Sequence, residues 1–293
     1  MKKILCPFLV FFLLTLLLSA KERLAEYLPE NAWVTMEIEN IGKLQTELNE
    51  GPFGKIWNHP AMDKVRARLI NQFPKNAENG PSKELLDRMI EFSEKFTGQV
   101  AFGFGGVENM LETDENDERG LPEAVLLADT KMTSDDLEEF MLWFEKEVKG
   151  FGGDIFMEKE EVAEEDVFFL WNSDRPEEKE SRLGIFVVDG VFCLGGGRST
   201  VEEMVESIVD EPSGGILDNP DYRDVFDEIG SGDVRFFVNF RGLGDILDFV
   251  RQSEDMQVPE NPFGVTTKGI LDALGLEGLE CVGLEMDFQS MQS

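Results

Sequence analysis

The chain has only one histidine, His59, among its 293 residues. A metal site that needs several histidines is therefore excluded, and a histidine-dependent hydrolase would rest on this one residue. His59 stands between Asn58 and Pro60, a combination typical of a turn that leads into a helix. We expect a solvent-exposed polar residue there. We predict no catalytic residue, no cofactor-binding residue and no cofactor.

Cysteine is almost as scarce. Cys6 lies inside the N-terminal apolar run, which leaves Cys193 and Cys281 in the rest of the chain. Both stand in apolar segments typical of strands, and an oxidising compartment would permit a disulfide between them. We favour the alternative, in which they are two buried thiols that pack as small hydrophobic residues.

Basic residues are few: 27 Lys and Arg stand against 60 Asp and Glu, a formal net charge of −33. Nucleic-acid binding depends on Lys and Arg displacing counterions from phosphates, so we expect no nucleic-acid partner. Anionic lipid surfaces are disfavoured for the same reason. Divalent cations and basic partners remain permitted, but a solvated acidic surface that keeps the protein soluble explains the charge without them.

Long hydrophobic runs are absent except at the N-terminus. Two lysines follow Met1, residues 4–18 are almost entirely apolar, and Ser19-Ala20 supplies small residues for cleavage. These are the parts of a secretory signal peptide, which we place at residues 1–20. The apolar run is shorter than the roughly 20 residues of a spanning helix. We predict an exported, periplasmic or extracellular protein; the alternative is a membrane anchor through an uncleaved N-terminal segment.

Apolar residues are present in quantity: 42% of the chain is hydrophobic, including 24 Phe. This is enough for a packed core in one or two domains. Residues 32–39 alternate apolar and polar positions, as in a half-buried strand, whereas residues 133–148 have apolar positions at helical spacing. The pattern predicts an α+β fold over residues 21–293, with antiparallel-rich mixed sheets and helices packed on one face.

Two hairpins are predicted in the middle of the chain. Asp189-Gly190 is a strong two-residue turn signal between two apolar runs. Upstream, residues 154–159 and 166–171 form a second predicted pair of strands, and we interpret residues 158–166 as its acidic loop.

Two strand–helix pieces of the sequence look alike. Residues 34–40 followed by Ile41 and Leu44 resemble residues 234–240 followed by Leu243 and Leu247. A unit used twice indicates two pseudo-repeated halves, residues 21–150 and 151–293.

Three glycines, residues 195–197, precede Arg198 and suggest a phosphate-binding loop. That loop requires a Lys directly before the Ser or Thr, which this segment lacks. We therefore interpret the glycines as a strand end that turns into a helix. Residues 199–202 match a capping box and predict that this helix begins at Ser199.

Carboxylates are so abundant that pairs for acid–base catalysis could be chosen anywhere. The densest loop contains Asp114, Asn116 and Asp117, whose oxygens are weak candidates for metal ligands. The spacing departs from the calcium-binding loop, which needs alternating ligands, an early Gly and a terminal Glu. A solvated acidic loop is the alternative interpretation.

Six short segments occur in an order that is familiar as a whole. They are residues 27–32 (Tyr-Leu-Pro-Glu-Asn-Ala), 51–57 (Gly-Pro-Phe-Gly-Lys-Ile-Trp), 96–101 (Phe-Thr-Gly-Gln-Val-Ala), 124–148, 185–194 and 217–222 (Leu-Asp-Asn-Pro-Asp-Tyr). This order resembles a family of exported bacterial proteins known as domain of unknown function number three-three-five-two. The resemblance covers nearly all of the chain after the leader. It implies an exported α+β envelope protein without an assigned reaction, and a C-terminus that is truncated relative to longer members.

Together these patterns favour a non-enzymatic interaction or structural module of the cell envelope or extracellular space. Its expected partner is an unknown protein or another envelope component, and the leader would contact the membrane only during export. Two alternatives remain open. One is an exported hydrolase that uses carboxylates or a metal held by them, and the other is a calcium-dependent surface protein.

Overall fold

The computed structural model describes residues 23–65, 83–105, 123–150, 155–172, 182–209, 215–230, 232–240 and 280–288. The predicted signal peptide, residues 1–20, lies outside the described residues. So do the weak metal-ligand candidates Asp114, Asn116 and Asp117, and the predicted helix that follows residue 240. The structure therefore does not test these predictions.

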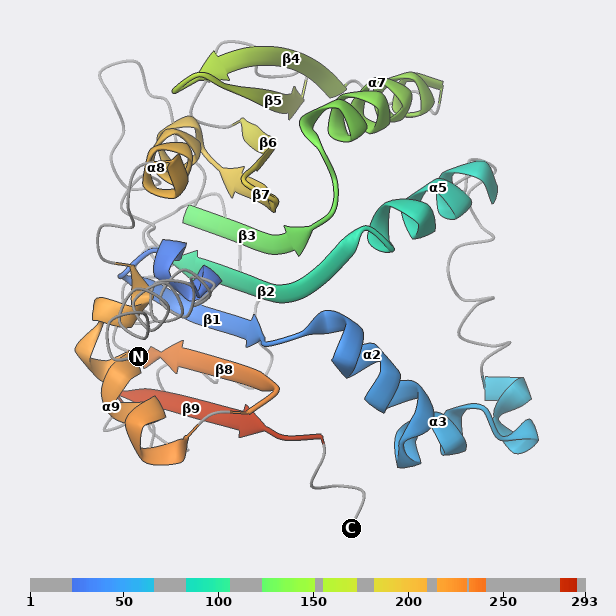
Figure 1. The fold of residues 1–293 in the computed structure, drawn as a ribbon, viewed down its shortest axis with the longest axis vertical. Helices are drawn as coiled ribbons and strands as arrows, with labels where there is room; N and C mark the ends of the chain where they lie inside the picture. Colours follow the sequence, from blue (N-terminus) through green and yellow to red (C-terminus); the bar gives the residue numbers. More distant parts are fainter. Residues whose placement is uncertain are drawn as a thin grey trace, which may run out of the picture.

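The described strands form one nine-stranded sheet in the order β4-β5-β6-β7-β3-β2-β1-β8-β9. Each strand is antiparallel to its neighbours, and the sheet runs from β4 at the top of Figure 1 to β9 at the bottom. The strands are β1 (Ala32–Ile38), β2 (Phe96–Gly105), β3 (Glu123–Thr130), β4 (Ile155–Val162), β5 (Glu165–Asn172), β6 (Leu183–Val188), β7 (Val191–Gly196), β8 (Val234–Asn239) and β9 (Cys281–Met286). The predicted α+β class is confirmed.

The helices and 3₁₀ turns of the described residues connect and cover these strands. They are η1 (Leu24–Tyr27), α2 (Ile41–Glu50), α3 (Pro52–Trp57), η2 (Pro60–Met62), α5 (Lys83–Ser93), α7 (Ser134–Gly150), α8 (Arg198–Val209), η4 (Ile216–Asp218) and α9 (Pro220–Ile229). None of the helices in these ranges is both long enough and apolar enough to cross a membrane.

Helices cover both faces of the sheet, not one face as the sequence suggested. Successive strand residues point to opposite faces. On β6, Phe186 packs in a cluster with Met204 of α8 and Tyr222 of α9, whereas its neighbour Val187 packs in a second cluster with Leu137 of α7. A strand that is buried on both faces has a continuous run of apolar residues instead of alternating apolar and polar ones. In this sequence, such runs indicate a sheet that is covered on both faces.

The hairpin turns show how local sequence sets the geometry. Asp189 and Gly190 join β6 to β7 with φ values of 47° and 76°, the paired positive φ of a type I′ turn, so this prediction is confirmed. Ala163 and Glu164 join β4 to β5 with φ values of 50° and 69°. The loop predicted over residues 158–166 is therefore wrong in extent, because Glu158–Glu161 belong to β4 and pair with β5.

The two proposed halves do not form separate parts of the sheet. β1, β2 and β3, from residues 21–150, occupy its centre. Strands from residues 151–293 flank them on both sides, with β7 next to β3 and β8 next to β1. Strands from both segments therefore share one sheet, and the two pseudo-repeated halves stay a prediction.

The two cysteines are far apart. Cys193 lies in β7 and Cys281 in β9, which are five strand spacings apart, or about 24 Å at ~4.8 Å each. A disulfide requires Cα atoms within about 7 Å, and none joins the two residues. The favoured prediction of two unbonded thiols is confirmed, but only Cys193 is buried as expected. Cys193 is fully buried, which raises the pKa of its thiol, and Cys281 is half-buried.

Candidate functional site

A buried polar network fixes η1 and α9 to the sheet. Glu37 of β1 is only 8% exposed, and it accepts a hydrogen bond from Arg23 at 2.7 Å and another from the hydroxyl of Tyr222. Arg23 also donates to the Tyr222 oxygen at 2.9 Å. Burial raises the pKa of Tyr222 well above its usual range, so the phenol stays protonated and donates to Glu37. The network holds η1 at a fixed place beside α9 and above β1.

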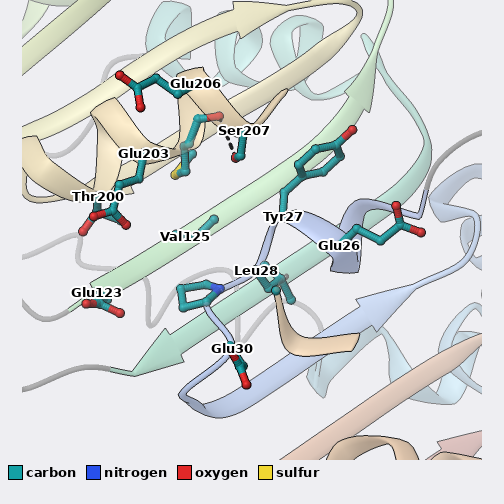
Figure 2. Close-up of a pocket in the computed structure, with 13 residues that line it drawn as sticks. Glu26, Tyr27, Leu28, Glu30, Glu123, Val125, Thr200, Glu203, Glu206 and Ser207 are labelled. Carbon is teal, nitrogen blue, oxygen red and sulfur yellow. Dashed lines mark hydrogen bonds between the residues drawn. The ribbon is translucent and has the colours of Figure 1, made fainter. Parts of the chain in front are cut away.

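A groove lies between η1 and α8 and has a volume of about 430 Å³. Figure 2 shows Thr200 and Glu203 of α8 on one side and Tyr27, Leu28 and Glu30 on the other, with Val125 of β3 between them. Its lining comes from η1 and the residues after it, the start of β3, α8, and Gly215 before η4. We call this hollow the acidic groove.

The floor of the acidic groove is apolar because the helical and strand patterns place core residues there. Leu28, Val125 and Met204 are at most 3% exposed and belong to the same hydrophobic cluster. On α8, Met204 shares the buried stripe with Val201 and Val205, at the i, i+3, i+4 spacing of a helix face packed on a sheet. The same spacing leaves Glu203 and Glu206 one turn apart on the exposed side of the helix.

Among its described lining residues, the acidic groove has five glutamates and no Lys or Arg. The glutamates are Glu26, Glu30, Glu123, Glu203 and Glu206. Within the described parts of the chain, four of them, all except Glu123, form no ion pair. Negative charges that share a hollow repel one another, and a bound cation would relieve that repulsion.

Gly215 closes one end of the acidic groove against η1. Its φ is +88°, a conformation that favours glycine, and a Cβ at this position would collide with the carbonyl oxygen of Glu26. The next residue, Ile216, donates its backbone N–H to the carbonyl of Leu28 at 3.0 Å. The wall contributed by residues 215–216 is therefore set by backbone contacts with η1.

The residues singled out from the sequence lie elsewhere. His59 is exposed, and its Nδ1 accepts a hydrogen bond from the backbone N–H of Ala61 at 3.2 Å, at the start of η2. The expectation of an exposed polar residue at a helix entry is confirmed. In the ranges that the structure describes, no group of three or more His, Cys, Asp or Glu side chains is arranged to hold a metal ion.

The glycine segment is a strand end followed by a helix, but its capping was predicted wrongly. α8 begins at Arg198, and Gly197, with φ of +91°, supplies the carbonyl that accepts the first helical hydrogen bond, from Val201. Ser199 therefore lies inside the first turn. Arg198 pairs with Glu160 at 2.6 Å and with Glu202 at 2.8 Å. These carboxylates at the helix start disfavour a phosphate there.

Sequence reasoning did not find the acidic groove. Residues 27–30 are one of the six ordered segments of the sequence, and no sequence pattern assigns a role to Glu203 or Glu206. A signal was present in α8: two glutamates at i, i+3 beside a buried methionine. This pattern indicates a site only because the tertiary structure places η1, about 175 positions earlier in the chain, opposite α8.

Comparisons with known proteins identify no family. No protein-family model matches the chain, and no curated protein matches it. A solved crystal structure of TP0453 (crystal form I) is similar over 80% of this chain and 70% of that chain, with 11% sequence identity and a TM-score of 0.35. A likeness at this level supports no statement about fold or function. The resemblance to the domain of unknown function stays a prediction.

Proposed function

We propose that this chain is a non-enzymatic binding module that holds a lysine- or arginine-bearing segment of a partner protein in the acidic groove. The observation that carries the proposal is the groove itself: about 430 Å³, five glutamates in its lining, and an apolar floor of Leu28, Val125 and Met204. The net charge of −33 adds a long-range field of the same sign, which steers basic partners towards the protein.

The apolar floor favours a peptide side chain over a bare ion. Lys and Arg bury their aliphatic stems on apolar surfaces while the charged group stays among polar atoms. Each buried CH₂ contributes about 0.8 kcal/mol. A carboxylate about 7 Å from an ammonium group in water adds ~0.6 kcal/mol before screening. A lysine stem on the floor, with its ammonium group near the glutamates of α8, would use both contributions.

Export is part of the same proposal. The predicted leader at residues 1–20 would deliver the binding module to the periplasm or the extracellular space. N-terminal sequencing of the mature protein tests this: a start near Lys21 supports secretion, and retention of Met1 in the mature pool would replace secretion with anchoring. The hydrolase and calcium-dependent alternatives stay predictions.

The binding proposal is tested by titrating the protein into a dye-labelled peptide in which lysine alternates with leucine, with fluorescence anisotropy as the readout. A matched peptide has glutamate in place of every lysine. We expect saturable one-to-one binding of the lysine peptide, weakened as salt rises from 10 to 150 mM, and no binding of the glutamate peptide. Equal binding of the two peptides, or none of either, would contradict the proposal.

A further inference from the structure

A second hollow, of about 330 Å³, lies where β1 ends and where β2 and β8 begin. We call it the arginine pocket. Arg23 and Arg235 line it together with Glu37, Glu39 and Gln99. None of these residues lines the acidic groove. In a chain with 27 basic residues out of 293, two arginines in one small hollow are an unusual concentration of positive charge.

Arg235 is the unexplained group in this pocket. On the sheet it stands opposite Glu37 of β1 and opposite Glu285 of β9. Side chains directly opposite each other have Cβ atoms about 5 Å apart and commonly pair when their charges are opposite. Within the described residues, however, Arg235 forms no ion pair. Its guanidinium lies 5.5 Å from the ring centroid of Phe226, and its Nε is buried without a hydrogen-bond partner.

The carboxylate of Glu37 is not available to Arg235. Both oxygens of Glu37 are used, one by Arg23 at 2.7 Å and the other by the hydroxyl of Tyr222. On the opposite side, Oε2 of Glu285 is buried and also lacks a hydrogen-bond partner. A guanidinium has five N–H donors in a planar fork, a geometry that matches a carboxylate. Arg235 therefore offers donors to a ligand carboxylate.

The balance of charge sets the class of ligand. Arg23 and Arg235 contribute two positive charges to the lining, and Glu37 and Glu39 contribute two negative ones, so the lining as a whole is close to neutral. A simple anion would meet two carboxylates, and a simple cation would meet two guanidinium groups. A molecule with one charge of each sign satisfies both sets of side chains.

The arginine pocket, at about 330 Å³, has room for a small molecule. We propose that the arginine pocket binds a free α-amino acid, whose carboxylate is held by Arg235 and whose ammonium group lies at the exposed carboxylate of Glu39. This ligand is distinct from the peptide segment proposed for the acidic groove, and it would bind independently of that segment.

The test begins with the whole chain and each of the twenty amino acids at 5 mM, monitored by thermal unfolding. The amino acid that raises the melting temperature most is then titrated by calorimetry beside two fragments of itself. One fragment is the same acid without its amino group, and the other is the same amine without its carboxylate. We expect the amino acid to bind at least tenfold more tightly than either fragment.

Two variants test the assigned contacts. Arg235→Gln should weaken binding of the amino acid at least tenfold, and Glu39→Gln should weaken binding of the amino acid but not of the deaminated acid. Arg223→Gln is the matched control, because Arg223 is an exposed arginine of α9 and its loss changes the net charge equally. This control should bind within twofold of the unmodified protein. If Arg235→Gln fails to fold, Glu39→Gln keeps the test readable, since Glu39 is exposed.

Three results would overturn the proposal. The first is that none of the amino acids raises the melting temperature or produces heat. The second is that the deaminated acid, or inorganic phosphate, binds as tightly as the amino acid, which would indicate a simple anion site. The third is equal weakening by Arg223→Gln and Arg235→Gln, which would indicate a non-specific effect of charge. Each result is separate from the peptide titration, which probes the acidic groove.

Discussion

Removal of two carboxylates from the acidic groove is the most direct way to test the proposed function. Glu203→Gln with Glu206→Gln keeps the shape of α8 and its buried stripe of Val201, Met204 and Val205, because both glutamates are exposed. The amide retains the size of the side chain and removes only its charge. Any loss of binding to the lysine peptide can then be assigned to electrostatics.

The expected magnitude follows from Coulomb's law. Two carboxylates about 7 Å from one ammonium group in water contribute roughly 1.2 kcal/mol without salt. The Debye length is about 30 Å at 10 mM salt and about 8 Å at 150 mM, so the contribution falls to ~0.9 and ~0.5 kcal/mol. The dissociation constant should therefore rise about fivefold at 10 mM salt and only about twofold at 150 mM.

Fluorescence anisotropy with the lysine peptide measures both ratios. The control is Asp227→Asn with Glu228→Gln, two exposed carboxylates of α9 that lie outside the groove lining and form no ion pair with a described residue. This control removes the same total charge, so it should leave affinity nearly unchanged at either salt concentration. Equal weakening by the two double variants would show that the peptide senses only net charge, and the reasoning about the groove would then be refuted.

Three further predictions concern stability and reactivity. Tyr222→Phe leaves one oxygen of the buried Glu37 without its hydroxyl donor. The free energy of unfolding, measured by urea denaturation, should therefore fall by about 1–3 kcal/mol. An unchanged urea midpoint would contradict the role of the buried polar network of Arg23, Glu37 and Tyr222. A hydrogen bond from Lys95, together with one from Thr133, lowers the pKa of Asp136 to about 2. The stabilisation is thus present above about pH 4 and lost as the pH falls towards 2. Because the pair is partly exposed, Asp136→Asn should cost only about 0.5–1 kcal/mol at pH 7 and almost nothing at pH 2; a pH-independent cost would argue against the ion pair. Iodoacetamide should modify Cys281 in the native protein faster than Cys193, which is fully buried with a raised thiol pKa, and the difference should vanish in denaturant; mass spectrometry of timed samples would reveal the reverse order if the burial of Cys193 were wrong.

Turns and caps could be predicted from the sequence because they depend on neighbouring residues. Asp189-Gly190 forms the expected type I′ turn, since these residues tolerate positive φ. The limits of α9 also depend on neighbouring residues: Asn219 before it accepts the Tyr222 N–H at 3.1 Å, and the helix ends at Ile229, before Gly230 with φ of +106°. The capping box at Ser199 was wrong, because Gly197, the residue after β7, takes the N-cap position two residues earlier.

The candidate site could not be predicted in the same way. Its lining comes from residues 26–30, 123–125 and 200–207, with Gly215. Each glutamate in these segments looks like any other exposed carboxylate in a chain that has 60 acidic residues. The arginine pocket is similar, since Arg23, Glu37 and Arg235 are scattered along the chain and are brought together by the pairing of β1 with β8.

By itself, the amino-acid sequence determined the α+β class, the type I′ hairpin, and a charge that opposes nucleic acid. These properties depend on steric and electrostatic effects between residues close in the chain, or on composition alone. Only the tertiary structure decided that helices cover both faces, that β8 lies beside β1, and that five glutamates line one groove. Those features depend on pairing between distant segments, where many arrangements satisfy the same local patterns and close packing of side chains selects one.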